Sequence, residues 1–512
     1  MKSSFLFLTL LIGPLLWGQD YFEEKINAPK SEFTFIGYYL MRGELNNFAP
    51  KNEFLKGQIV GRLFGTNSTR MIEGQSRFSE MRFIPIIAYT PRIFDGWASM
   101  RMSFEFDWTQ GDANYGAGGN FGGAFGADFV NMQTQNLYLE LHPATGLYIN
   151  MGLARLFDNI LVPAYTGTST LINTGYRLAF WGSDASGLTT YYLRDRWRTK
   201  LGLYQLYENN VDQDDDVILT EFDYEYDFDH VHALGFSAWY LRDHANGEGG
   251  VSILGQGLNS ALADYNGVYQ FEFGNNDYKA DVIWLGTHFH GNPLLDQGRF
   301  GYSGFAVLNT GSAWTDSVNV KIMGYALNTR LAYKYGRTTN DLLALDITYT
   351  SGDKDNIRDG EYNGVLTGNN WSAPGAVYFS HGLYLLLPHG NVVNRFTGAV
   401  MDIQNIGYGL FAQSFVASYD LIPHKLMAKT AVGYGLAPVA PFGGGHEIGT
   451  EVNFNLRYTP KVFFDIELHA AYLKLGDFYE SAIVNGSDPN GVNIGIPKDP
   501  WTVFLTLKWI MF

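Results

Sequence analysis

Apolar and polar residues alternate one by one in several stretches of the chain. The clearest stretch is EVNFNLRYTPKVFFDIELHAAY, residues 451–472, where the alternation continues on both sides of Thr459-Pro460-Lys461. Successive side chains of a β-strand point to opposite faces. The pattern therefore predicts a hairpin with one apolar face and one polar face.

The same alternation recurs at residues 97–108, 217–228, 322–336 and 342–350. The polar faces carry full charges, which a water-filled interior tolerates and a packed core does not. Tyrosine and tryptophan often close the apolar stripes, as in the aromatic girdles of membrane barrels. The pattern favours an all-β fold, a single transmembrane antiparallel up-and-down β-barrel. A large soluble β-sandwich or β-helix remains the alternative.

The connections between the predicted strands fall into two length classes. Short turns are predicted at residues 90–96, 142–146, 194–198, 227–231, 274–277, 336–341, 420–424 and 459–461. Long connections rich in Gly, Asn and Asp occupy residues 110–130, 244–263, 290–321, 352–406 and 476–499. Short turns at one end and long loops at the other are typical of outer-membrane barrels, whose short side is periplasmic. With both termini on the short side, the turns predict about 18 strands, within a range of roughly 16–20.

This strand count depends on the segments that are left out of the wall. Residues 175–182, 300–309 and 376–387 are assigned to loops, and residues 31–42 to an N-terminal segment. A barrel of this size encloses a lumen wide enough for water. The connections at 157–186 and 352–406 are longer than a loop tip needs, so at least one is expected to fold inward and narrow the lumen.

The two ends of the chain add targeting and assembly signals. Residues 1–18 contain Lys2 and a short apolar run, which predicts a signal peptide, since a spanning helix needs about 20 apolar residues. Residues 19–55 are then a periplasmic lead-in segment, and residues 56–512 form the outer-membrane barrel. The last strand, PWTVFLTLKWIMF, ends on an aromatic residue and carries Trp501, Val503 and Leu505 on its apolar face.

Composition supports the barrel and removes several functions. Aromatic residues make up 16% of the chain, there are 59 glycines, and the mean hydropathy is only −0.11, as expected for half-apolar strands. The net charge of −16 argues against nucleic-acid binding. The chain has no cysteine, so it has no disulfide, no cysteine lipid anchor and no cysteine-based metal or redox chemistry. No cofactor is expected.

Charged residues on the predicted inner faces are the candidate pore-lining residues. Rings of charged side chains select solutes by sign, although any one of these residues can instead belong to a hydrogen-bonded lining without a selective role. The strand with Glu221, Asp223, Glu225 and Asp227 needs a basic strand, water or cations opposite it, and Lys200 is a candidate neighbour. The full set is Arg82, Arg101, Glu105, Asp107, Glu221, Asp223, Glu225, Arg330, Lys334, Lys429, Glu451, Arg457, Asp465 and Glu467.

Other reactive side chains give weaker signals. The pairs His230/His232 and His288/His290 could each grip a metal from one strand face, but no third ligand is fixed, so rim histidines are the preferred interpretation. Acidic clusters at 212–216 and 353–361 lack EF-hand spacing and are interpreted as solvated loops. No metal site is predicted.

The sequence contains little that indicates an enzyme. His469 shares a predicted inner face with Asp465 and Glu467, which resembles half of a catalytic arrangement without an evident nucleophile. The chain has no G-x-S-x-G, H-E-x-x-H or P-loop motif. No catalytic residue is assigned, and the protein is predicted not to be an enzyme.

Two short motifs resemble the alginate-export group of outer-membrane porins. LYINMGLAR, residues 147–155, is similar to a strand of that group that ends in Gly-Arg-Gln, although Leu153 and Ala154 stand before Arg155 here. TYTSGDKD, residues 348–355, is similar to its Ser-Gly-Asp at a strand-to-loop junction. The resemblance implies an 18-stranded barrel that passes an anionic polysaccharide or another small polar solute. The mixed signs of the inner charges do not identify the solute.

The leading hypothesis is a porin-like channel in the bacterial outer membrane, for passive passage of small polar or anionic solutes, saccharides included, through a charged, loop-constricted lumen. One alternative is the barrel component of a secretion or cell-surface complex with a plugged pore. The other is an outer-membrane hydrolase. The expected partners are outer-membrane lipid, lipopolysaccharide and a polar solute, with a homo-oligomer or a surface protein complex but no nucleic acid.

Overall fold

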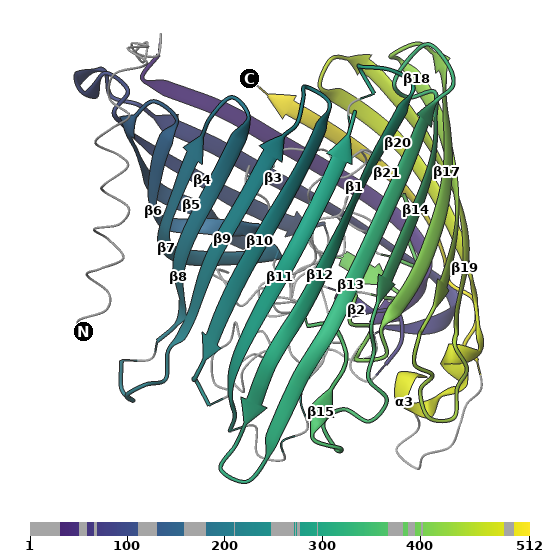
Figure 1. Cartoon of the computed structure of the whole chain (residues 1–512). Coiled ribbons are helices and arrows are strands. Elements are labelled where there is room, and N and C mark those ends of the chain that lie inside the picture. The colour runs from purple at the N-terminus through teal and green to yellow at the C-terminus, as the bar shows by residue number, and fades with distance from the viewer. Residues whose placement is uncertain are drawn as a thin grey trace.

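The strands of this protein pair into a sheet that closes on itself (Figure 1). The structure, a computed structural model, describes residues 31–50, 59–65, 69–110, 131–157, 181–208, 210–246, 271, 273, 277–293, 295–366, 382–387, 395–400, 403–485 and 496–511. Eighteen strands form a closed antiparallel barrel, in which the last strand pairs with the first and Met511 lies opposite Gly37. The predicted all-β transmembrane barrel with about 18 strands is confirmed.

The wall strands follow one another around the barrel in chain order. They are β1 (Phe33–Pro50), β3 (Thr69–Tyr89), β4 (Ala98–Thr109), β5 (Asn131–Ala144), β6 (Leu147–Phe157), β7 (Trp181–Leu193), β8 (Trp197–Tyr207), β9 (Val217–Asp227), β10 (His232–Asp243), β11 (Lys279–Gly291), β12 (Phe300–Trp314), β13 (Asn319–Lys334), β14 (Leu342–Thr350), β17 (Leu410–Ile422), β18 (Leu426–Leu436), β19 (Glu447–Lys461), β20 (Phe464–Leu475) and β21 (Trp501–Met511).

The remaining elements are short. β2 (Ile59–Arg62) pairs in parallel with β16 (Arg395–Gly398), and β15 (Glu361–Tyr362) pairs in parallel with β13. The helices are η2 (Arg92–Phe94), η3 (Asp477–Glu480) and α3 (Ala482–Asn485). None of the helices in the described part of the chain is long and apolar enough to cross a membrane.

The two faces of the wall have opposite chemistry, and β13 shows this most clearly. Its burial alternates residue by residue: Met323 and Leu327 are 61% and 46% exposed, whereas Asn328 and Arg330 are 8% and 5% exposed. Because the sheet is closed, the buried polar face is the inner one and the exposed apolar face is the outer one. The alternation in the sequence therefore corresponds to outside and inside.

The connections define a turn end and a loop end of the barrel. The turn end is at the top of Figure 1, where β21 finishes, and the loop end is at the bottom, where β15 and α3 lie. The turn end carries the connections 90–97, 145–146, 194–196, 228–231, 292–299, 335–341, 423–425 and 462–463. Seven of the predicted short turns fall there. Residues 277–278, at the end of the predicted turn 274–277, instead precede β11 at the loop end.

The boundary between lead-in segment and barrel was predicted too late in the chain. Residues 33–50 of the predicted lead-in are β1, which pairs with β3 on one side and with β21 on the other. Gly37 and Gly43 interrupt its outer apolar stripe, and Leu40 is buried on its inner face. These three residues blur the alternation that the prediction relied on. The predicted signal peptide, residues 1–18, lies outside the described residues.

The segment 300–309 is also wall and not loop. It belongs to β12, which pairs with β13 over its whole length and with β11 from Tyr302 to Trp314, so the predicted long connection 290–321 is wrong. The inner face of β12 carries Phe305 and Val307, both buried. With apolar residues on both faces, the period-two signal disappears. Trp181 and Gly182, placed in a loop by the prediction, begin β7.

Loops fold into the barrel from the loop end. Within the long connection 351–409, the indole of Trp284 on β11 donates to the backbone oxygen of Leu366 at 2.9 Å, and the amide of Asn309 on β12 accepts from the Leu366 N–H at 3.0 Å. Both wall residues are on inner faces, so the prediction of an inward loop is confirmed for 352–406. For the other predicted inward loop, residues 158–180 lie outside the described residues.

Candidate functional site: the charged interior

All the predicted pore-lining residues lie on inner-face positions of their strands. Glu105, Asp107, Glu221, Asp223, Glu225, Arg330, Lys429, Glu451 and Glu467 are buried there, and Arg82, Lys334, Arg457 and Asp465 are partly buried. Arg101 is more exposed, with 44% of its side chain accessible. Whether these residues line a path for solutes remains a prediction.

On β3 and β4, one arginine serves two carboxylates. The Arg82 guanidinium donates to both oxygens of Asp107, each at 2.8 Å, and lies 2.5 Å from Glu105. The strand register makes this geometry possible, since Arg82 is directly opposite Asp107. Nearer the turn end, Arg101 donates to Glu140 on β5 at 2.8 Å.

The acidic strand β9 is neutralised by two cations of its neighbour β8. Arg198 on β8 is 2.5 Å from Glu225 and 2.7 Å from Asp227, and Lys200 forms a buried ion pair with Glu221. Repulsion among carboxylates on one strand requires this compensation. The predicted neighbour Lys200 is confirmed, whereas Arg198 was not predicted. Its position follows from the register, which places it opposite Glu225.

One predicted rim histidine is buried instead. His288 on β11 is 1% exposed. On the inner face of the wall, its Nε2 lies 2.5 Å from the carboxylate of Glu225 on β9, two strands away. His232 does lie at the turn end, where its backbone and ring hydrogen-bond to Asp229. The His232 ring and the backbone N–H of Val231 together lower the pKa of Asp229 to about 2. No group of three or more His, Cys, Asp or Glu side chains in the described ranges is arranged to hold a metal.

The strands β13 and β14 carry a buried ion pair whose two charges cancel. Arg330 donates to Asp346 at 2.9 Å, and the amide of Asn328 donates to the other Asp346 oxygen at 3.0 Å. Lys334, nearer the turn end, donates to the backbone oxygen of Leu295 at 2.7 Å. Arg330 and Lys334 therefore both have hydrogen-bond acceptors within the protein.

The strands β18 to β21 gather cations around a single glutamate. Glu467 lies 2.7 Å from Lys508 and 3.0 Å from His469. Arg457 donates to Asn340 in the turn 335–341 at 3.1 Å. Lys429 is buried on the inner face of β18, and within the described part of the chain its ammonium has no ion-pair or hydrogen-bond partner. We call Lys429, Arg457 and Lys508 the cation cluster; the carboxylates nearest to it on β20 are Glu467 and Asp465, which lies opposite Lys508.

Sequence reasoning missed Lys508 as a lumen residue. It is one of the alternating inner positions of β21 with Thr502, Phe504 and Thr506, all of which are buried. The assignment of Trp501, Val503 and Leu505 to the outer face is confirmed, and it already places Lys508 inside by parity.

His469 is held as a packed side chain. Its ring stacks on Phe504 with centroids 4.3 Å apart and meets the edge of Tyr384 at 5.1 Å. Asn455 donates to the imidazole at 3.1 Å. A histidine enclosed by two aromatic rings and 1% exposed does not present itself to a substrate, so its environment favours a structural role over a catalytic one.

An apolar loop core occupies the interior near the loop end. We use this name for the buried cluster of Leu63, Phe64, Leu383, Leu385, Leu386, Ile403, Phe478, Tyr479 and Val484. Three connections contribute to it: 51–68, 351–409 and 476–500. Phe64 meets Tyr479 edge to face with centroids 4.9 Å apart, which ties the first of these connections to the last. The loop core therefore narrows the interior with apolar side chains.

The junction motif Ser351-Gly352-Asp353 anchors this loop. It directly follows β14, as predicted. The carboxylate of Asp353 accepts the backbone N–H groups of Asp355 and Asn363 at 3.1 and 2.9 Å. A Cβ on Gly352 would stand 2.3 Å from the backbone oxygen of Tyr408, so only glycine lets the two ends of the connection meet.

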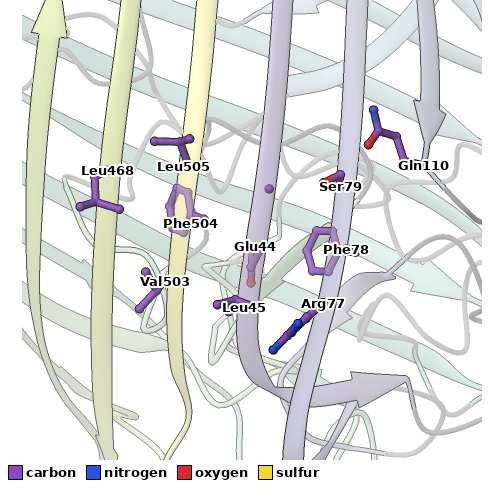
Figure 2. A pocket seen from close by; sticks show the side chains of 11 residues that line it. Glu44, Leu45, Arg77, Phe78, Ser79, Gln110, Leu468, Val503, Phe504 and Leu505 are labelled. Carbon is purple, nitrogen blue, oxygen red and sulfur yellow. The ribbon is translucent and has the colours of Figure 1, made fainter.

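One hollow of about 500 Å³ lies at the barrel wall (Figure 2). Its outward lining comes from Leu45, Arg77, Leu468, Val503 and Leu505 on β1, β3, β20 and β21. It forms where Gly43 has no side chain. Glu44, Phe78 and Phe504, which are on inner-face positions, also line the hollow, so it borders both faces of the wall at this place.

Comparison with known proteins gives a similar architecture only. No family model and no curated protein matches the chain. Similar solved structures are OccAB4 of Acinetobacter baumannii (10% identity over 94% of this chain and 99% of that chain, TM-score 0.46) and OccK2 (OpdF) of Pseudomonas aeruginosa (10%, 93% and 97%, TM-score 0.48). A BenF-like porin from Pseudomonas fluorescens Pf-5 is another (9%, 93% and 99%, TM-score 0.48). At such identities and TM-scores, the function has to be argued from the interior itself.

Proposed function

We propose that this protein is an outer-membrane channel, and not an enzyme, which lets small polar or anionic solutes pass passively through a charged lumen narrowed by loops. The observation that carries the proposal is the closed wall with an apolar outer face and an ionic inner face. In hydrocarbon a sheet must close to satisfy its backbone, and its inner face is then free to meet water.

The cation cluster supports a preference for anions. Elsewhere on the described wall, the arginines and lysines of the inner face are paired with carboxylates or backbone oxygens, as Arg82, Lys200 and Arg330 are. In the cluster, Lys429 is buried without such a partner and Lys508 shares Glu467 with His469. A charge in a low-dielectric wall acts on a passing ion more strongly than the same charge in water.

Ion selectivity in planar bilayers tests this proposal. The wild-type protein should conduct, and Lys429→Gln should lower the ratio of anion to cation permeability. Two unit charges 4 Å apart in water interact by about 1 kcal/mol, which sets the change at roughly fivefold. Lys474→Gln is the matched control, because Lys474 is exposed on the outer face of β20 and its loss should leave selectivity unchanged. Absence of conductance in the wild type would contradict the channel. An equal effect of both variants on selectivity would contradict the role of the cation cluster.

A plugged barrel in a secretion or cell-surface complex is the second candidate. The observation that favours it is the apolar loop core, which excludes water from part of the interior. Under this alternative the purified protein would not conduct, and a protein partner would copurify in fixed proportion. Conductance by the isolated barrel would reject it.

The localisation and the solute extend the same proposal. We place the turn end in the periplasm, with residues 1–18 as the export signal and lipopolysaccharide around the loop end. The resemblance of the Ser-Gly-Asp junction at the end of β14 to the alginate-export group makes an alginate-like solute the one to test first. Liposome swelling with uronate oligomers, compared with neutral oligosaccharides of equal length, tests the solute. Equal entry of both would remove the alginate-like solute and leave the channel.

A further inference from the structure

A six-residue segment of the β14–β17 connection lies directly against the inner wall. This lumen segment, residues 382–387, packs on β18 at two positions that carry no side chain. A Cβ on Gly433 would stand 2.4 Å from Cδ1 of Leu383, and one on Gly435 would stand 3.1 Å from Cδ1 of Leu386. The lumen segment therefore packs directly on the backbone of β18 at these two glycines.

One wall carboxylate binds three successive backbone N–H groups of the lumen segment. Glu451 on β19 accepts from Tyr384 at 2.7 Å with Oε1, and from Leu385 and Leu386 at 2.9 and 2.7 Å with Oε2. Asn453 donates both to Glu451 and to the backbone oxygen of Gly382. The carboxylate is completely buried, so these charge-assisted bonds are what compensates its loss of hydration.

The other contacts of the lumen segment are backbone and apolar. The backbone N–H groups of Ala399 and Val400 donate to the oxygens of Leu385 and Leu386, at 2.7 and 3.0 Å. The ring of Tyr384 packs on His469 and Phe504. Side chains of leucine fill the loop core but cannot satisfy a buried N–H group. Without an acceptor at Glu451, the segment loses three of the hydrogen bonds that fix it to the wall.

We propose that Glu451 is a positioning residue that pins the lumen segment inside the barrel and so controls the width of the pore beside β18 and β19. The inference rests on the proposed channel function and adds the residue that controls its width. Glutamine at this position keeps one acceptor oxygen but turns an NH2 group toward backbone donors. The lumen segment then leaves the wall more often, and the pore widens.

Single-channel recording compares the wild type with Glu451→Gln. The variant should show a severalfold larger or noisier conductance and admit larger neutral polymers. Glu447→Gln is the matched control, because Glu447 begins the same strand and is exposed. A second readout follows movement directly. The chain has no cysteine, so Leu385→Cys gives a single thiol, which should react with a water-soluble maleimide faster when Glu451→Gln is also present.

The two readouts separate the inference from the channel function. Unchanged conductance and unchanged labelling in a folded Glu451→Gln barrel would overturn the role of Glu451 even if the wild type conducts. Faster labelling in a barrel that never conducts would support the role of Glu451 and reject the channel. If Glu451→Gln fails to fold, Asn453→Ala removes only the supporting amide and should give a smaller increase in labelling. Labelling equal to the wild type in that variant would overturn the inference.

Discussion

Single carboxylates hold backbone segments at both ends of this barrel. At the turn end, Asp341 accepts the N–H groups of Arg337 at 2.7 Å and Thr338 at 3.1 Å through one oxygen, and that of Asp420 at 2.9 Å through the other. Burial opposes ionisation, but these donors and the nearby Arg337 charge prevail and lower the pKa of Asp341 below its usual 3.8. The turn 335–341 is thereby fixed to the neighbouring strand β17.

Asp341→Asn should destabilise the folded barrel by about 1–3 kcal/mol at neutral pH, because at least one backbone donor loses its acceptor. Since the folded pKa is lowered, the stabilisation by Asp341 is complete above the unfolded pKa of 3.8 and is lost as the pH falls through the folded value. Unfolding temperatures of both proteins between pH 7 and pH 3 measure this. A difference that stays constant down to pH 3 would contradict the role of the ionised carboxylate.

At this scale the parity of a residue predicted its face but not its partner. Every predicted pore-lining residue is on the inner face. Glu451, however, binds a segment 65 to 67 residues away, and no local pattern encodes such a distant contact. The same holds for His288, which reaches Glu225 from two strands away.

Among the strands, alternation identified the elements whose inner face is charged, such as β9, β13 and β19. It missed β1 and β12. In β12 the reason is the apolar inner face with Phe305 and Val307, so that both faces are apolar. In β1 the inner face does carry Arg42 and Glu44, but Gly37 and Gly43 interrupt the outer apolar stripe. Strand periodicity is informative only where the two sides of a sheet meet different media. Inside this barrel the medium changes from water to packed loops.

Between strands β3 and β4, Arg82→Met should cost about 3–5 kcal/mol, because it leaves Glu105 and Asp107 buried without their cation. Arg101→Met is the comparison, since Arg101 has 44% of its side chain exposed and faces one carboxylate. Its loss should cost about 1 kcal/mol or less. Chemical denaturation in lipid vesicles, followed by tryptophan fluorescence, gives both values. Equal costs would contradict the importance of burial for the Arg82 cluster.

For the whole molecule, the strand count was predicted correctly although two segments were misassigned. The loss of β12 from the predicted wall was offset by the turn predicted at 274–277, and the loss of β1 by a barrel predicted to start at residue 56, which lies before β3. Two termini on the same side require an even number of strands, and chain length then restricts the choice. Global closure therefore constrained the count more firmly than any single strand did.

The outer face offers a test of the membrane position of the barrel. Phe454→Arg puts a charge in the middle of the apolar band of β19, where Phe454 is 44% exposed, and should destabilise the protein in bilayers by about 2–4 kcal/mol. Val462→Arg, in the turn 462–463 with Val462 77% exposed, should be tolerated. Folding yield into vesicles compares the two. Equal tolerance would mean that hydrocarbon does not cover β19.

The seam between β1 and β21 has a consequence for biosynthesis. It joins Gly37 to Met511, the largest sequence separation of any strand pair here, while every other wall contact is between successive strands. A folding chain can form its hairpins one after another, because they are local in sequence. The two edge strands nevertheless keep unpaired backbone N–H and C=O groups until the last strand, which ends at residue 511, is present. Unclosed intermediates should therefore associate through these edges, and a truncation that removes β21 should yield aggregates instead of smaller barrels.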